Sequence, residues 1–129
     1  KKGYQTNLFK SYKESYKDGE QKRDFIYVKD CISILLWFLE NKNLSGIFNV
    51  GTGEANTFND LVANVYFCLN RNVNIKYIEM PDSLKKQYQY ETKANLNKLR
   101  NIGYKKEFYT LKEGISDYIE ILESSDYVS

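Results

Sequence analysis

The chain has 129 residues, of which 19 are Lys or Arg and 17 are Asp or Glu, so its formal net charge is +2; it contains no histidine. This length fits a single domain, and a composition of 42% hydrophobic and 28% charged residues is ordinary for a globular protein. The absence of histidine excludes Ser-His-Asp and Cys-His nucleophile pairs and histidine-containing zinc sites. Any acid–base chemistry must therefore come from Lys, Tyr, Asp or Glu.

The two cysteines and the apolar runs narrow the class further. Cys31 and Cys68 lie among apolar residues, are too few for a thiolate metal site, and could form one disulfide. Without a recognisable signal peptide we expect a cytoplasmic protein that binds no metal. The longest apolar run, residues 34–39, is too short to span a bilayer, so we expect no membrane partner. The 12 tyrosines come without RNA-binding motifs, and we expect no nucleic-acid partner.

The first third of the chain predicts a polar arm, a strand and a helix. Residues 1–22 are lysine-rich without hydrophobic periodicity, which indicates a partly ordered arm with one helical turn at most. The aromatic and β-branched run at residues 25–28 predicts a buried strand. Asp30 is a suitable N-cap for the helix that follows. This helix should be central to the core because apolar residues cover most of its sides: Ile32, Leu35, Leu36, Trp37, Phe38 and Leu39.

The middle of the chain predicts two more strands around a helix. Residues 47–50 form the second expected strand, which stops at the Gly51-Thr52-Gly53 turn. Thr57 caps the next helix, with Asp60 three residues later as its capping-box partner. The run Ile75–Ile78 predicts the third strand, and a short helix or turn follows at residues 82–86.

The last third predicts two helices and a tail. Thr92 is expected to cap a helix that ends at Gly103. Thr110 and Glu113 form a capping box before a final amphipathic helix, and residues 124–129 should fray. The order of elements predicts an α/β fold with a small sheet of about three short strands and packed helices. Such a sheet has at least one exposed edge, which suggests a missing partner.

Three segments could carry chemistry. The GTGEAN turn at residues 51–56 is placed like a dinucleotide-binding loop, but Asn56 stands at the third glycine position, which favours a plain strand-to-helix turn. Arg23 could bind a phosphate through two parallel hydrogen bonds, or simply pair with Asp24 or Asp30. The lysines and tyrosines of residues 85–90 could hold an anion, or form a solvated helix end.

Three segments together resemble the ADP-heptose 6-epimerases, a family of extended short-chain dehydrogenase/reductases with a Rossmann-type fold. These are KRDFIYVKD, LWFLENKNLSGIFNVGTGEANTFNDL and YIEMPDSLKKQYQYETKANLNKLRNIGYKKEF. The first two occur broadly in sugar-nucleotide epimerases and dehydratases, whereas the combination with the third is specific to the heptose epimerases. The resemblance covers residues 20–122, about the last third of such an enzyme, and implies a substrate-binding α/β domain over residues 23–123.

The resemblance also implies an activity and site residues. The family epimerises carbon 6 of an ADP-heptose by transient oxidation and re-reduction with NADP, and the product feeds lipopolysaccharide inner-core assembly. Arg23 matches the arginine that contacts the ADP part of the substrate, and Tyr88 matches a substrate-binding tyrosine. Phe9 matches a substrate-contacting segment, and Lys2 matches a second acid–base residue, although a longer stretch separates these two positions in the family.

The sequence also departs from the family. Glu91 replaces an aromatic residue, and Asn95 replaces Asp. No tyrosine is followed four residues later by a lysine, and no complete NADP glycine fingerprint is present. Both belong to the family's N-terminal domain, so the resemblance implies a chain that is inactive alone and whose partner is that domain or a second copy. A free-standing nucleotide-binding module and a non-catalytic interaction domain are the alternatives.

Overall fold

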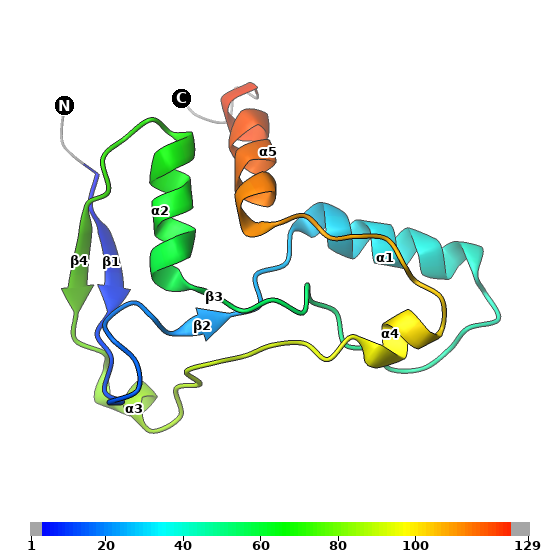
Figure 1. The fold of residues 1–129 in the computed structure, drawn as a ribbon, viewed down its shortest axis with the longest axis horizontal. Helices are drawn as coiled ribbons and strands as arrows, with labels where there is room; N and C mark the ends of the chain where they lie inside the picture. Colours follow the sequence, from blue (N-terminus) through cyan, green and yellow to red (C-terminus); the bar gives the residue numbers. More distant parts are fainter. Residues whose placement is uncertain (1–3, 125–129) are drawn as a thin grey trace.

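The computed structural model describes residues 4–124 and confirms the α/β class (Figure 1). The elements follow in the order β1 Thr6–Phe9, β2 Lys22–Arg23, α1 Val28–Glu40, β3 Asn56–Thr57, α2 Phe58–Cys68, β4 Ile75–Ile78, α3 Asp82–Lys85, α4 Asn97–Asn101 and α5 Leu111–Ser124. The described strands form two separate pairs. Strands β1 and β4 are parallel, with Thr6 opposite Ile75, and β2 and β3 are antiparallel, with Lys22 opposite Thr57.

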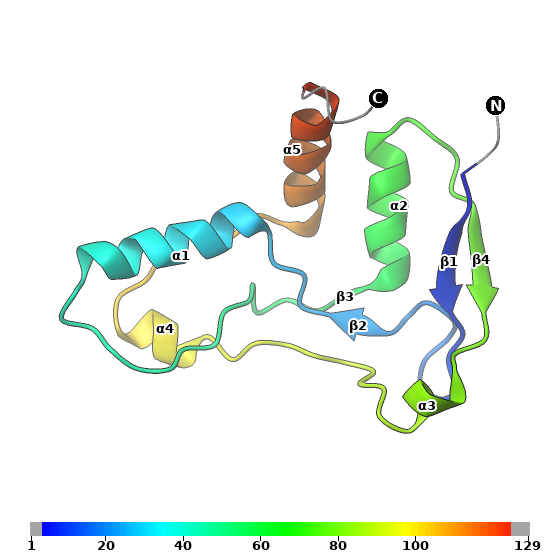
Figure 2. The same ribbon diagram turned by 180° about the vertical axis from the view of Figure 1, so that it is seen from behind.

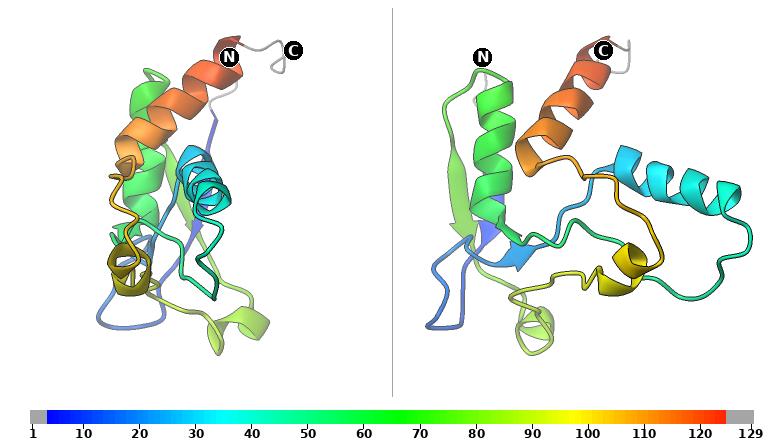
Figure 3. Two further views of the ribbon diagram at one scale, coloured as in Figure 1. Left: turned by 90° about the vertical axis from the view of Figure 1, so that its right-hand side faces the viewer. Right: turned by 45° about the vertical axis from the view of Figure 1, so that its right-hand side comes forward.

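One end of the molecule is built from β1, β4 and α2. Helix α2 lies between the β1–β4 pair and α5 in several views (Figures 1 and 3). It begins at a capping box, as predicted, in which Thr57 and Asp60 exchange side-chain and backbone hydrogen bonds. Its buried residues Val62 and Tyr66 pack with Leu8 of β1 in one hydrophobic cluster. This packing holds β1 against α2.

The other end is built from α1 and α4, which lie far from the β1–β4 pair (Figure 2). Ile34, Leu99 and Tyr104 form a second buried cluster there, and Trp37 and Phe38 pack against it. Gly103 has a φ of +111° just after α4 and ends that helix as predicted. The capping box of Thr110 and Glu113 at the start of α5 is also confirmed.

Two of the three predicted strands are wrong. In the segment 25–28, the first three residues pair with no strand and Val28 already begins α1; the ring of Phe25 packs on Phe58 and that of Tyr27 on Tyr109. Residues 47–50 have no regular secondary structure and pair with no strand of the described chain; the carbonyl of Ile47 instead accepts a hydrogen bond from Nζ of Lys98 at 2.8 Å. Conversely, Thr6–Phe9 lies in the segment expected to be an arm and forms β1, because Ile75–Ile78 supplies its backbone partners.

Two expected caps are also wrong. Tyr27, not Asp30, occupies the N-cap position of α1. Asp30 is 1% exposed within the first turn, where it accepts a hydrogen bond from the backbone N–H of Tyr109. Thr92 does not cap a helix, since α4 begins at Asn97 and the backbone N–H of Thr92 donates to the carbonyl of Lys22 instead. Helix α1 is not central to the core, because four of its predicted core residues are exposed: Ile32, Leu35, Leu36 and Leu39.

The remaining sequence expectations concern cysteines, the membrane and the termini. Cys31 and Cys68 are free thiols. Within residues 4–124, no helix is long and apolar enough to cross a membrane. The predicted fraying beyond Ser124 lies outside the described residues, and so does Lys2.

Candidate functional site

Strand β2 brings Arg23 next to Tyr88, which is 65 positions away in the sequence. The backbone N–H of Lys22 donates to the carbonyl of Tyr90 at 2.7 Å, so the segment around Tyr88 runs along β2. The guanidinium carbon of Arg23 lies 5.1 Å from the centre of the Tyr88 ring and 5.8 Å from that of Phe58. These distances are typical of cation–π contacts, so the positive charge lies near two aromatic rings.

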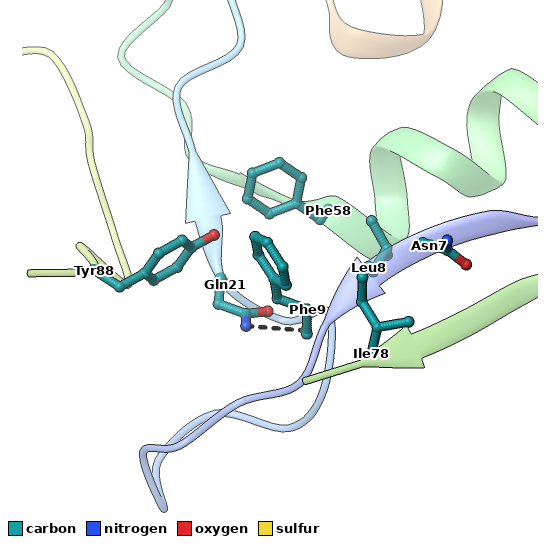
Figure 4. A pocket seen from close by; sticks show the side chains of 7 residues that line it. All are labelled: Asn7, Leu8, Phe9, Gln21, Phe58, Ile78 and Tyr88. Atoms are coloured by element: carbon teal, nitrogen blue, oxygen red, sulfur yellow. Dashed lines mark hydrogen bonds between the residues drawn. The ribbon is translucent and has the colours of Figure 1, made fainter. Parts of the chain in front are cut away.

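A cavity of about 220 Å³ lies beside these groups, and Phe9 forms part of its wall. The ring of Phe9 meets that of Tyr88 edge-on at 6.4 Å. Figure 4 shows Phe9, Phe58 and Tyr88 converging from three segments of the chain. The lining residues are Asn7, Leu8, Phe9, Gln21, Phe58, Ile78 and Tyr88. The structure therefore brings together three of the four residues that the family resemblance selects, namely Phe9, Arg23 and Tyr88.

Gln21 lines this cavity and connects two segments of its wall. It is 1% exposed, and its Nε2 donates to the backbone carbonyls of Phe9 and Lys10, each at 3.2 Å (Figure 4). Because one amide group bonds both carbonyls, the end of β1 is tied to the start of β2. Phe9 and Arg23 thus keep a fixed relation to each other.

Arg23 does not form the ion pair with Asp24 or Asp30 that the sequence also allowed. Its Nη1 donates to the carbonyl of Lys22 at 2.7 Å, and neither Asp24 nor Asp30 forms a salt bridge with it. The carboxylates of Asp24 and Asp30 are instead bonded to backbone N–H groups. A guanidinium with unused donors next to an aromatic cavity suits a phosphate-bearing ligand with a flat ring.

Asp24 joins three segments at the end of β2. Its Oδ1 accepts from the N–H and hydroxyl of Thr52 at 2.7 and 2.6 Å, and its Oδ2 accepts from the N–H groups of Gly53 and Ala94 at 2.9 and 3.1 Å. Burial by itself raises the pKa of Asp24, but these hydrogen bonds outweigh burial and lower it below its ordinary value. Asp24 therefore anchors the chain immediately after Arg23.

The same contacts decide the role of the glycine turn. A dinucleotide-binding loop offers its free N–H groups to a pyrophosphate. Here the N–H groups of Thr52 and Gly53 already donate to Asp24. A side chain at Gly51 would also meet the Asp24 carboxylate at 2.5 Å. The turn therefore has a structural role. Its residues do not fit a nicotinamide cofactor, because these N–H groups already have an acceptor within the chain.

The basic segment at residues 85–90 is largely engaged with its neighbours. Lys85 pairs with Asp82 at 2.7 Å and lies 4.2 Å from the ring centre of Tyr12. The hydroxyl of Tyr90 accepts from the backbone N–H of Tyr12 at 2.8 Å. Of this segment, Tyr88 is the residue that reaches the cavity. Among residues 4–124, no group of His, Cys, Asp or Glu side chains could hold a metal ion.

Sequence reasoning missed Gln21, Phe58 and Asp24 as site residues. Gln21 lies in the lysine-rich stretch that predicts an arm, and nothing in its surroundings indicates burial. Phe58 reaches Arg23 only because β3 pairs with β2 and carries the start of α2 to that place. A hint existed for Asp24, since a carboxylate directly after Arg23 would need partners of its own if it did not pair with the arginine.

Comparisons with known proteins show what this chain is similar to. Residues 6–51 match the model of the NAD dependent epimerase/dehydratase family. Curated proteins named ADP-L-glycero-D-manno-heptose-6-epimerase are similar to most of the chain. The one from Fusobacterium nucleatum is 51% identical over 92% of this chain and 37% of its own length. The one from Nitratidesulfovibrio vulgaris is 46% identical over 87% of this chain and 35% of its own length.

A solved structure shares the fold. The Helicobacter pylori ADP-L-glycero-D-manno-heptose-6-epimerase superposes with a TM-score of 0.71 at 26% identity, over 94% of this chain and 34% of that one. In fold and in family match, the chain is similar to a segment of the NAD dependent epimerases and dehydratases. More particularly, the chain is homologous to a segment of the ADP-heptose 6-epimerases, which confirms the family resemblance. It spans little more than a third of the length of these curated relatives.

Proposed function

We propose that this chain is the C-terminal, substrate-binding portion of an NADP-dependent ADP-heptose 6-epimerase that acts in the cytoplasm. The whole enzyme would convert ADP-D-glycero-D-manno-heptose to the L-glycero epimer for lipopolysaccharide inner-core synthesis. The names of the relatives support the substrate and the reaction. One observation carries the proposal: Phe9 and Tyr88 line one cavity, and Arg23 contacts the ring of Tyr88 beside it. The resemblance selected each of these three residues from a different part of the chain.

Each of these residues has a role that its surroundings support. The guanidinium of Arg23, fixed by the Lys22 carbonyl, would donate hydrogen bonds to the diphosphate of the ADP-sugar. The hydroxyl of Tyr88 would donate to another polar atom of the same ligand. Phe9 would supply apolar surface against which the ligand packs. Lys2, which lies outside the described residues, is proposed as the second acid–base residue.

Catalysis requires a nicotinamide cofactor, which in this family removes a hydride from carbon 6 and returns it. The glycine turn of this chain gives its N–H groups to Asp24 and does not suit that cofactor. We therefore infer that NADP is bound by the portion of the family that this chain does not span. The chain alone should bind an ADP-sugar weakly and not epimerise it, because the site of the whole enzyme lies between the two portions.

Calorimetric titration of the chain with ADP tests the role of Arg23. Replacing a charged, bidentate donor removes about 1.5–3 kcal/mol of binding free energy, so Arg23→Ala should weaken ADP binding by about 10- to 100-fold. Tyr88→Phe keeps the ring and loses one neutral hydrogen bond, so it should weaken binding by about fivefold.

Arg71→Ala is the matched control. Arg71 is exposed and lies 4.6 Å over the ring of Tyr4, away from the cavity, and its loss changes the net charge by the same amount. ADP should bind this variant as it binds the unchanged chain. Equal affinities for Arg23→Ala and Arg71→Ala would remove Arg23 from the binding site.

A further inference from the structure

The side-chain amide of Gln21 has a fixed orientation in the wall of the cavity. Its Nε2 donates to the backbone carbonyls of Phe9 and Lys10, each at 3.2 Å. A carbonyl oxygen only accepts hydrogen bonds, so the nitrogen of the amide must face these two groups. Both hydrogens of the NH₂ group are thereby used. The remaining polar atom of the side chain is Oε1, which is an acceptor.

No group within residues 4–124 donates a hydrogen bond to Oε1 of Gln21. The residue is 1% exposed, and it lines the cavity of about 220 Å³. Among the described residues, the side-chain atoms that are fully enclosed and unpaired are Oδ1 of Asp30 and the hydroxyl of Tyr104. Oε1 of Gln21 is therefore not sealed in the interior. Figure 4 shows it among the side chains that line the cavity, and we conclude that it opens into that space.

The wall around this oxygen is mostly apolar. Four of the lining residues present only carbon atoms from their side chains, namely Leu8, Phe9, Phe58 and Ile78. The ring of Tyr88 meets that of Phe9 edge-on at 6.4 Å. An acceptor in such surroundings costs free energy when a bound molecule covers it without offering a donor. The cavity should therefore discriminate between flat ligands by whether they carry an N–H group at this point.

We propose that Gln21 is a specificity-determining residue, whose Oε1 accepts a hydrogen bond from the exocyclic amino group of a purine base. This inference rests on the proposed function, which assigns the diphosphate to Arg23. The guanidinium carbon of Arg23 lies 5.1 Å from the centre of the Tyr88 ring, so a diphosphate bound there leaves the base beside the aromatic wall. An oxo group in place of the amino group has no hydrogen to donate, and its lone pairs face those of Oε1. Gln21 thus selects adenine over a 6-oxopurine.

NMR titrations with ADP and with inosine diphosphate test the proposal, because the two bases differ in the amino or oxo group at carbon 6. The unchanged chain should bind ADP about tenfold more tightly or better, since inosine diphosphate leaves Oε1 unpaired. Gln21→Met keeps the length of the side chain and removes the acceptor, so the two nucleotides should bind with about equal affinity. Arg23→Ala should weaken both by the same factor and keep the preference for ADP.

Gln89→Met is the matched control, because it makes the same chemical change at an exposed glutamine that does not line the cavity. This variant should keep the preference for ADP. If Gln21→Met loses the connection between β1 and β2 and unfolds, the comparison of the two nucleotides on the unchanged chain still decides.

Equal affinities of the unchanged chain for both nucleotides, together with weaker binding by Arg23→Ala, would overturn this inference and leave the proposed function standing. A preference for ADP that persists in folded Gln21→Met would also overturn it. An unaltered affinity in Arg23→Ala would count against the proposed function alone, provided that Gln21→Met still loses the preference. A chain that binds neither nucleotide would overturn both.

Discussion

Asp24 is a single carboxylate on which the local order of the site depends, because it joins β2 to Thr52, Gly53 and Ala94. In Asp24→Asn, an NH₂ group would face N–H groups that need an acceptor. The free energy of unfolding should fall by about 2–3 kcal/mol at pH 7, measured by urea denaturation. Because its native pKa is lowered, Asp24 stabilises the fold above the unfolded pKa of about 3.9, and this is lost as the pH falls through the native value. The variant should therefore lose less stability on acidification than the unchanged chain.

Asp82 provides the control for this prediction. Its pKa is also lowered, by a hydrogen bond and the charge of Lys85, but the carboxylate is exposed and bonds no other segment. Asp82→Asn should change the free energy of unfolding by less than about 1 kcal/mol. If the two variants lose the same stability at pH 7, the network around Asp24 does not hold the site together.

Asp30 should show the opposite pH trend. Burial raises its pKa, although the Tyr109 N–H and the charge of Lys106 act against burial, and its Oδ1 has no partner among the described residues. A raised native pKa means that stability falls as the pH rises from the unfolded pKa through the native one. Asp30→Asn cannot ionise, so its stability relative to the unchanged chain should improve between pH 3.5 and pH 7. Urea titrations at both pH values measure this difference, and a difference that worsens toward pH 7 would contradict the assignment.

At the same scale, the sequence selected Arg23, Tyr88 and Phe9 as candidate site residues only through their motifs. Local pattern alone favoured a surface ion pair for Arg23. In the structure, neither Asp24 nor Asp30 forms a salt bridge with Arg23, and residues 88–92 lie along β2, a contact between segments about 65 positions apart. Gln21 and Phe58 depend on similar long-range pairing and have no local signature.

At the scale of elements, the capping boxes allow a sharp test of where helices begin. Thr57→Ala and Thr110→Ala each remove an N-cap hydroxyl that accepts a backbone hydrogen bond, and each should cost about 1 kcal/mol in unfolding free energy. Thr92→Ala should cost less than about 0.5 kcal/mol, because its contact with Lys22 uses the backbone N–H. Guanidinium denaturation of the three variants measures this, and a cost for Thr92→Ala equal to the others would restore the helix start predicted there.

Helices were more predictable than strands for a physical reason. A capping box spans only four residues, so each capping threonine, Thr57 or Thr110, can be recognised together with its acidic partner three positions later. A strand needs a partner from elsewhere in the chain. Thr6–Phe9 becomes a strand because Ile75–Ile78 pairs with it, whereas residues 47–50 have strong β-propensity and no partner in the described chain.

At the scale of the whole molecule, the two buried clusters lie at opposite ends, joined by short strands and loops (Figure 1). The amphipathic period of α1 predicted that one apolar face lies in the core, but its residues Ile32, Leu35, Leu36 and Leu39 are exposed. The residue of α1 that is buried in a cluster is Ile34, which the prediction did not select. Periodicity identifies the faces of a helix, but it cannot tell a core within the chain from a surface that another portion covers. For α1, this is the main limit of the sequence prediction.

Leu99→Ala should destabilise the α1–α4 end of the molecule and leave the other end intact, because Leu99 is 1% exposed and belongs only to the cluster at the α1–α4 end. Such truncations of buried leucines cost about 2–5 kcal/mol. The loss should appear as faster amide hydrogen exchange in α1 and α4, while β1, β4 and α2 keep their protection through the separate cluster of Leu8, Val62 and Tyr66. Val62→Ala is the reciprocal variant: it should speed amide hydrogen exchange in β1, β4 and α2 and leave α1 and α4 protected. Uniform loss of protection across the chain in both variants would mean that the ends unfold as one unit.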